Sequence, residues 1–296
     1  CVALNSGTDA LVFGLLALGV RSGDEVITPP NSFIASTAAI VHLKAKPVFV
    51  DVLPDQNIDP SRIERAITSK TKAIMPVHLT GRIASMNAIL EIAKHHQIPV
   101  IEDAAQSVGS RFSGRPSGSF GKIGCFSAHP LKNLNACGDA GFLTTDDEYI
   151  AKQVRLSRNN GLSDRNTVEQ FGYVSRMDAL QAAILEYRLS LLAQVIEKRR
   201  KNADMYRELL NSSKIHIPEE REEEFNTYHT FVIQCDKRNE LKGYLMKQGI
   251  ETAIHYPVPI PLQPAALTLE YSKGNFPVTE TQSERILTLP IHQYLQ

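Results

Sequence analysis

The chain of 296 residues is long enough to form one large domain and a smaller second one. Its 43% hydrophobic and 22% charged residues are ordinary values for a globular protein. Basic and acidic residues number 32 each, so the composition gives no electrostatic reason to expect binding to nucleic acid or to an anionic membrane.

The four cysteines, Cys1, Cys125, Cys137 and Cys235, form no C-x-x-C pair and have no neighbouring histidine cluster at zinc-ligand spacing. They predict free thiols in a reducing compartment and no metal site. The sequence has no uninterrupted apolar run of about 18 residues, so we expect no transmembrane helix. No signal peptide opens the chain, and the expected location is the cytoplasm.

Along the first half of the chain, short apolar strands alternate with helical patterns. The predicted strands are Val2–Leu4, Glu25–Thr28, Pro47–Asp51, Ala73–Val77 and Val100–Asp103. The predicted helices are Ala10–Leu18, Phe33–Leu43, Pro60–Ala66 and Met86–His95. This alternation predicts an α/β fold whose mostly parallel sheet is covered on both faces.

The second half predicts a smaller α+β unit. Two nearly continuous helical patterns are followed by a glutamate-rich solvated loop, and then by a strand, a helix and a strand. These segments are Asp178–Leu192, Ala193–Leu210, Glu219–Glu224, Tyr228–Cys235, Asn239–Lys247 and Glu251–His255. We therefore expect a large domain, 1–195, and a small C-terminal domain, 196–296. The chain opens in a strand and ends without a terminal helix, so we expect both termini to be truncated.

Four pieces of sequence carry candidate chemistry. A turn at Gly7 and Thr8 opens a helix, whose free amides can bind an anion. Phe33 follows the second strand, and Asp103 ends an apolar strand, at the sheet edge where α/β proteins bind ligands. Lys132 lies in a loop of small residues. Each feature alone has an ordinary structural explanation as a helix cap, core residue, turn residue or surface residue.

Together the four pieces match what pyridoxal phosphate (PLP) requires. The cofactor needs a lysine for its Schiff base, a carboxylate beside the pyridine nitrogen, an anion cradle for its phosphate and a flat apolar partner for its ring. The chain supplies these groups in the order phosphate turn, ring partner, aspartate and lysine. We therefore predict a PLP enzyme.

The motifs S-G-T-D-A-L, E-D-A-A-Q-S and H-P-L-K-N-L begin at Ser6, Glu102 and His129. With G-D-E-V-I-T-P and K-P-V-F-V-D, they make the whole chain resemble the DegT/StrS sugar aminotransferases. The resemblance implies the PLP-dependent transferase fold type I, with a large domain around a mostly parallel central sheet and a small C-terminal α+β domain. It also implies a homodimer with shared active sites. Relative to that family, an N-terminal segment and a short C-terminal helix are missing.

The resemblance implies roles for individual residues. Lys132 would form the Schiff base and move protons once freed, and Asp103 would pair with the pyridinium. The other implied contacts are Gln106 near the cofactor 3-hydroxyl, Ser127, Gly7 and Thr8 at its phosphate, Phe33 on its ring, and His255 and Tyr256 near the substrate. One position departs from the family: Val174 stands where an asparagine usually reaches the phosphate of the neighbouring subunit. Valine has no side-chain donor, so we expect weaker cofactor binding.

The implied reaction moves an amino group from an amino acid, expected to be L-glutamate, to a keto sugar linked to a nucleoside diphosphate. The segment Gly138–Gly141 after the lysine favours amination at C3 over C4. Three alternatives stay open: a dehydratase, a non-catalytic PLP-binding or regulatory homologue, and a protein that keeps only the fold. A histidine replaces the lysine in the dehydratases, so Lys132 argues against the first.

Overall fold

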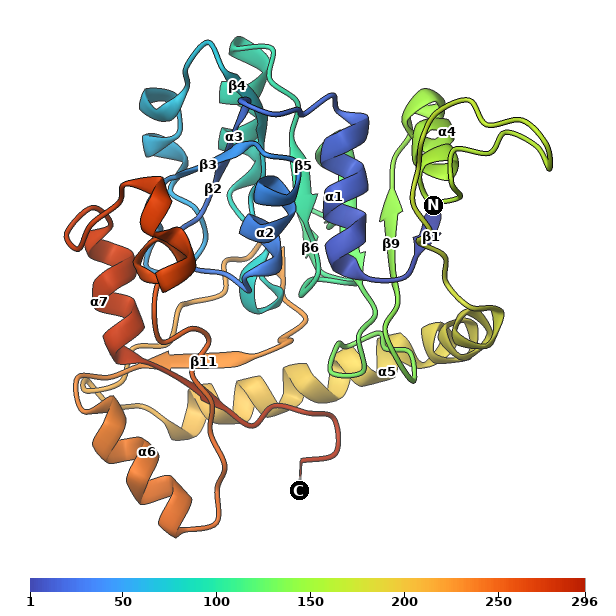
Figure 1. Ribbon diagram of the computed structural model, residues 1–296. Helices are drawn as coiled ribbons and strands as arrows, with labels where there is room; N and C mark the ends of the chain where they lie inside the picture. Colours follow the sequence, from blue (N-terminus) through green and yellow to red (C-terminus); the bar gives the residue numbers. More distant parts are fainter. Residues whose placement is uncertain (296) are drawn as a thin grey trace.

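The centre of the molecule is a mixed β-sheet, which a computed structural model describes together with the rest of residues 1–295 (Figure 1). In spatial order its strands are β1 (Val2–Leu4), β9 (Gly141–Thr144), β8 (Ile123–Ser127), β5 (Ile101–Asp103), β4 (Thr71–Ile74), β2 (Glu25–Thr28) and β3 (Lys46–Phe49). Isolated bridges join β4 to β5. Pairing is antiparallel where β9 meets β1 and β8, and parallel elsewhere. The predicted mostly parallel sheet is thus confirmed.

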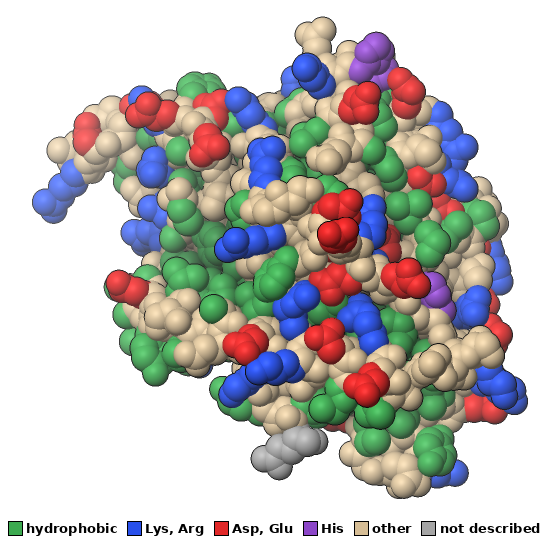
Figure 2. Space-filling model, turned by 180° about the vertical axis from the view of Figure 1, so that it is seen from behind, with side chains coloured by type: hydrophobic (Ala, Val, Ile, Leu, Met, Phe, Trp, Pro, Cys, Tyr) green, Lys and Arg blue, Asp and Glu red, His purple; other side chains and the backbone are tan. Residues whose placement is uncertain are grey.

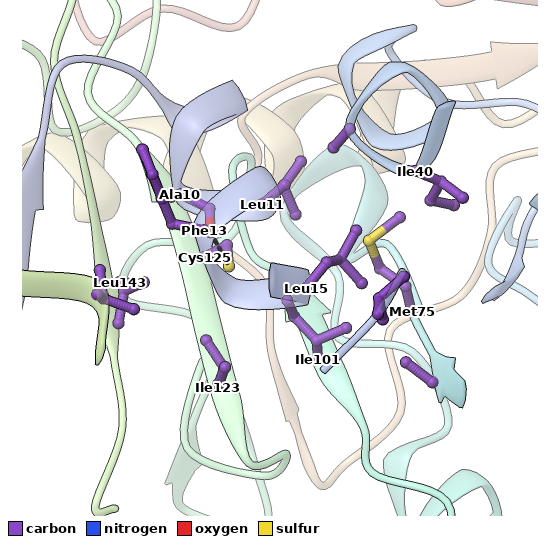
Figure 3. Close-up of a cluster of buried hydrophobic side chains, with 14 of the residues drawn as sticks. Ala10, Leu11, Phe13, Leu15, Ile40, Met75, Ile101, Ile123, Cys125 and Leu143 are labelled. Atoms are coloured by element: carbon purple, nitrogen blue, oxygen red, sulfur yellow. Dashed lines mark hydrogen bonds between the residues drawn. The ribbon is translucent and has the colours of Figure 1, made fainter. Parts of the chain in front are cut away.

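Helices cover both faces of this sheet. The helices of this part are α1 (Gly7–Ala17), α2 (Ala35–His42), α3 (Met86–His95) and α4 (Glu148–Ser157). In Figure 3, α1 presents Ala10, Leu11 and Leu15 to side chains of β5 and β8. The Cys125 thiol on β8 donates to the Ala10 carbonyl at 3.2 Å. α1 is apolar on nearly every side, as expected of a helix packed within a core.

The C-terminal part is built on α5 (Ala179–Leu209), which runs across the lower half of Figure 1, above α6. Its regular elements are β11 (Phe231–Gln234), α6 (Arg238–Lys247), α7 (Pro277–Arg285) and β12 (Ile286–Leu289), and β11 pairs antiparallel with β12. Three short strands, β6 (Arg111–Phe112), β7 (Arg115–Pro116) and β10 (Glu224–Phe225), form a separate small sheet. Five 3-10 turns complete the fold: Pro60–Arg62, Glu64–Ala66, Leu79–Gly81, Ile260–Leu262 and Pro264–Leu269.

α5 belongs to both parts of the molecule. Leu192 and Ile196 pack in a cluster with Ala128 and Leu134 beside the central sheet. Ala203, further along the helix, packs in the core formed by β11 and β12. The two helical patterns predicted here therefore form one helix, and the proposed boundary at residue 195 lies within it. The division into two domains remains a prediction.

By length and composition α5 could cross a membrane, which the sequence reading excluded. Helices of globular proteins can pass the same test of length and composition. The helix is also tied to the sheet domain, because Arg188 donates to the carbonyls of Asn135 and Ala136 at 2.8 and 3.2 Å. We therefore treat α5 as part of the fold.

Three other predictions were wrong. Pro60–Ala66 forms two 3-10 turns rather than an α-helix. Glu251–His255 makes a single bridge, at Ala253, rather than a strand, and prolines beginning at Pro257 supply no N–H groups that could extend a ladder. The glutamate run is not wholly solvated, because Glu224 is buried and its carboxylate lies 3.0 Å from Arg82. A buried carboxylate needs such a partner.

A buried, hydrogen-bonded carboxylate lies beneath the edge of the sheet where Asp103 ends β5. The adjacent Glu102 accepts hydrogen bonds from His78 Nε2 at 2.8 Å and from the amides of Gly118 and Gly121 at 2.7 and 2.6 Å. Burial opposes ionisation, but these donors outweigh it and lower the pKa of Glu102 below its usual 4.5. The carboxylate thus ties two loops to β5, the one that contains His78 and the one between β7 and β8.

Replacing this carboxylate, as in Glu102→Gln, weakens hydrogen bonds to a buried charged group and should lower the free energy of unfolding by about 1.5–3 kcal/mol in urea titrations at neutral pH. Because the folded pKa lies below 4.5, this contribution is present above pH 4.5 and is lost as the pH falls through the folded value. The difference between wild type and variant should therefore shrink in acid. A difference that is equally large at about pH 3 would contradict this assignment.

Candidate active site

A cavity of about 390 Å³ opens where the carboxyl ends of β5 and β8 meet the start of α1. All nine predicted site residues line it: Gly7, Thr8, Phe33, Asp103, Gln106, Ser127, Lys132, His255 and Tyr256. The structure thus brings together residues from both halves of the sequence.

The first turn of α1 forms one end of the cavity. Ser6 caps the helix, and its hydroxyl accepts from the Asp9 amide at 3.1 Å. Within residues 1–295 the amides of Gly7 and Thr8 have no hydrogen-bond partner. A Cβ atom at Gly7 would lie 2.6 Å from that of Ser127, so only glycine allows this close approach. Two free amides and the Ser127 hydroxyl therefore make a site for an anion.

Asp103 lies buried at the end of β5. Its Oδ2 accepts from the Ser36 hydroxyl at 2.6 Å, and its Oδ1 accepts from the Ala105 amide at 3.1 Å. Two donors on the charged form hold the carboxylate in one orientation. The sequence reading missed Ser36. Its position on α2, three residues after Phe33, is the signal that could have pointed to it.

Lys132 reaches the cavity from the loop between β8 and β9. The loop is held by two bonds to Ala128, whose amide donates to Ala140 and whose carbonyl accepts from Ala136, each at 2.8 Å. Burial lowers the pKa of the Lys132 amino group, and the nearby Asp103 partly offsets this. Lowering the pKa increases the uncharged fraction of the amine, which is the form that attacks a carbonyl.

Another part of the lining joins Gln106, which follows β5, to Tyr256 from the C-terminal part. Gln106 accepts from the Thr80 amide at 2.8 Å and donates to the Tyr256 hydroxyl at 3.4 Å. The Tyr256 ring lies 6.2 Å from that of Phe33. Burial, followed by the charge of Asp103, raises the pKa of Tyr256 to about 12, so its hydroxyl stays protonated and can donate.

His255 lies beside Tyr256 and shares a hydrogen bond of 2.9 Å with the Thr288 hydroxyl. Burial and the neighbouring Lys132 lower the pKa of its ring, which favours the uncharged form. His229, which the sequence reading also missed, lines the same cavity.

A separate group of potential metal ligands lies on the surface. Glu64, His95 and His96 place one ligand atom each within 4.8 Å of one another. None of them lines the cavity. The expectation that the active site uses no metal remains a prediction.

Three comparisons show what this chain is similar to. It is 41% identical over 299 residues to the "pleiotropic regulatory protein" of Geobacillus stearothermophilus, covering 100% of this chain and 80% of that protein. It is 41% identical over 298 residues to UDP-N-acetyl-3-dehydro-alpha-D-glucosamine 3-aminotransferase of Acidithiobacillus ferrooxidans, with the same coverages. Its structure matches that of Streptomyces venezuelae DesV with a TM-score of 0.97, 38% identity and coverages of 100% and 80%.

The fold and the cavity are those of a fold-type I, PLP-dependent aminotransferase. The model of the DegT/DnrJ/EryC1/StrS aminotransferase family matches residues 1–296, and the chain belongs to this family. The residues present fit the cofactor, because an amine, a carboxylate and two unpaired amides share one cavity.

The hydrogen bond from Ser36 to Asp103 yields a test. Ser36→Ala removes a donor to a buried carboxylate, worth about 1.5–3 kcal/mol, so PLP affinity should fall roughly 10- to 150-fold. The dissociation constant can be measured by spectral titration of the cofactor-free protein. Ser61→Ala, at an exposed turn, is the control. Unchanged affinity in Ser36→Ala would show that this bond does not support cofactor binding.

Proposed function

We propose that this enzyme transfers an amino group from L-glutamate to a keto sugar linked to a nucleoside diphosphate, at C3 in preference to C4. The relative from A. ferrooxidans is named for amination of a UDP-linked sugar at C3. The segment Gly138–Gly141 resembles members that act on 3-keto sugars. The donor assignment rests on the family resemblance.

The observation that carries this proposal is the presence of Lys132 and Asp103 in one cavity. Bound PLP supplies the electron sink that makes the α-proton of an amino acid removable. Lys132 would anchor the cofactor and, once free, carry that proton, for which its lowered pKa suits it. Asp103, oriented by Ser36 and Ala105, would keep the pyridine nitrogen protonated.

The remaining residues would bind and orient the two ligands. The unpaired amides of Gly7 and Thr8, with Ser127, would hold the cofactor phosphate. Phe33, exposed to the cavity, would cover the ring face. Other contacts would come from Gln106 near the cofactor 3-hydroxyl, and from His255 and Tyr256 beside the substrate.

We also propose a homodimer with shared sites. Large apolar side chains are exposed on and beside the segment that follows α4: Phe171, Tyr173, Val174, Leu180 and Tyr187. Figure 2 shows hydrophobic side chains gathered beneath this protruding segment. Phe33 and Leu131, at the cavity, are themselves 55% and 76% exposed. Exposed apolar surface of this extent is typical of an interface, so a second copy would complete each cavity.

A non-catalytic regulatory role is the second candidate, because the relative from G. stearothermophilus carries a regulatory name. The complete set of Lys132, Asp103, Gln106 and Ser127 in one cavity favours catalysis. Free thiols at Cys1, Cys125, Cys137 and Cys235 support a reducing location, which we assign to the cytoplasm.

Absorption spectra test the catalytic assignment. Protein loaded with PLP should show a long-wavelength Schiff-base band that L-glutamate bleaches and that a 3-keto nucleotide sugar restores. Lys132→Ala should lack the band, whereas Lys94→Ala, an exposed lysine on α3, should keep it. Folded wild-type protein without a band would rule out catalysis and favour the regulatory role. Recovery only with 4-keto sugars would reject C3.

The departure at Val174 gives a gain-of-function test. Val174→Asn should restore a donor to the partner's cofactor phosphate and tighten PLP binding roughly 10- to 150-fold, as expected for about 1.5–3 kcal/mol. Val168→Asn changes another exposed valine of the same segment and should have no effect. Equal PLP dissociation constants for both variants and wild type would refute the role of position 174.

A further inference from the structure

His229 presents its imidazole to the cavity from the segment between β10 and β11. The residue is half-buried, and its Nδ1 atom is buried without a hydrogen-bond partner within residues 1–295. Leaving a buried polar atom unpaired is costly, so a hydrogen-bond partner for this imidazole is expected.

The backbone around His229 is held from several sides. Arg199 on α5 donates to the carbonyls of Tyr228 and His229 at 2.9 and 3.2 Å. Asn133, next to Lys132, donates to the Thr227 carbonyl at 2.9 Å. Tyr228 has a φ of 45°, in the left-handed region. These bonds fix the backbone of His229 relative to the lysine loop.

Most other polar groups of the cavity already have partners. Asp103 is bonded to Ser36 and Ala105, Gln106 to Thr80 and Tyr256, and His255 to Thr288. The amino group of Lys132, in contrast, makes no hydrogen bond within the described chain, and burial and the charge of Asp103 are what act on its pKa. An amine and an imidazole, both unpaired, thus line the same cavity.

The charges around His229 suit such a pairing. Burial, followed by the positive charges of Lys132, Arg199 and His255, holds the pKa of His229 well below 6.5. The imidazole is therefore uncharged near neutral pH and keeps one nitrogen lone pair as an acceptor. A protonated amine has three N–H donors and no acceptor.

We propose that His229 is a positioning residue for Lys132, whose free amino group donates a hydrogen bond to the uncharged imidazole. This role takes Lys132 as the cofactor lysine, as proposed above. The imidazole would hold the amine in place whenever it is not bound to the cofactor.

The first test uses cofactor-free protein and no activity. The titration of His229 can be followed by ¹⁵N NMR of labelled histidine, with His229→Gln to assign its signals. Lys132→Ala removes both a donor to the neutral ring and a neighbouring positive charge, so the pKa of His229 should rise by about one unit. Lys94→Ala is the control and should leave it unchanged. An unaltered titration in Lys132→Ala would overturn the pairing, whether or not the protein is an aminotransferase.

The second test measures the lysine. Cofactor-free protein regains the visible band of PLP at a rate set by its uncharged amine, so the pH midpoint of that rate reports the pKa of Lys132. His229→Phe removes the acceptor that stabilises the charged amine and should shift this midpoint to lower pH. His229→Gln, which keeps an acceptor, should restore it, and exposed His42→Phe should not move it.

One outcome would assign His229 to the substrate instead. If His229→Phe leaves the midpoint unchanged and raises KM for the keto sugar, with the donor half-reaction intact, the ring binds sugar and the proposal fails.

Discussion

The cavity depends on one close contact, between the first turn of α1 and the ends of β8 and β9. A side chain at Gly7 would collide with Ser127, and one at Gly141 would lie 2.2 Å from the backbone carbon of Ser6. Because both positions are glycine, the positive end of the helix can lie directly against the sheet edge. This contact places the anion site and both ends of the lysine loop, which runs from β8 to β9.

Two neighbouring carboxylates on β5, those of Glu102 and Asp103, have different roles at this edge of the sheet. Side chains alternate across a strand, so Asp103 faces the cavity while Glu102 points to the opposite side. There Glu102 holds His78 and the amides of Gly118 and Gly121. A fixed strand end limits the positions that Asp103 can take, so the stability of this region and the geometry of the cavity are coupled.

Hydrophobic periodicity allowed prediction of β1 to β5, β11 and most helices, whereas the nine cavity residues were predicted from local motifs and from the family resemblance. The sequence did not allow prediction of Ser36 or His229, which become part of the site only when distant segments meet. The burial of Glu224 was missed for a similar reason, since its partner Arg82 is far away in the chain. The prediction of an α-helix at Pro60–Ala66 was wrong because a short helical pattern does not distinguish an α-helix from 3-10 turns.

α5 lies in both cores and contains no proline or glycine along its 31 residues. Sharp kinks in helices arise almost always at such residues, at bulges or at inserted groups. A hinge motion between the sheet domain and the C-terminal part would have to bend this continuous helix. For the dimeric sugar aminotransferase proposed above, we therefore expect substrate entry and product release to depend on loop movement, while the two parts of one chain keep a fixed mutual orientation.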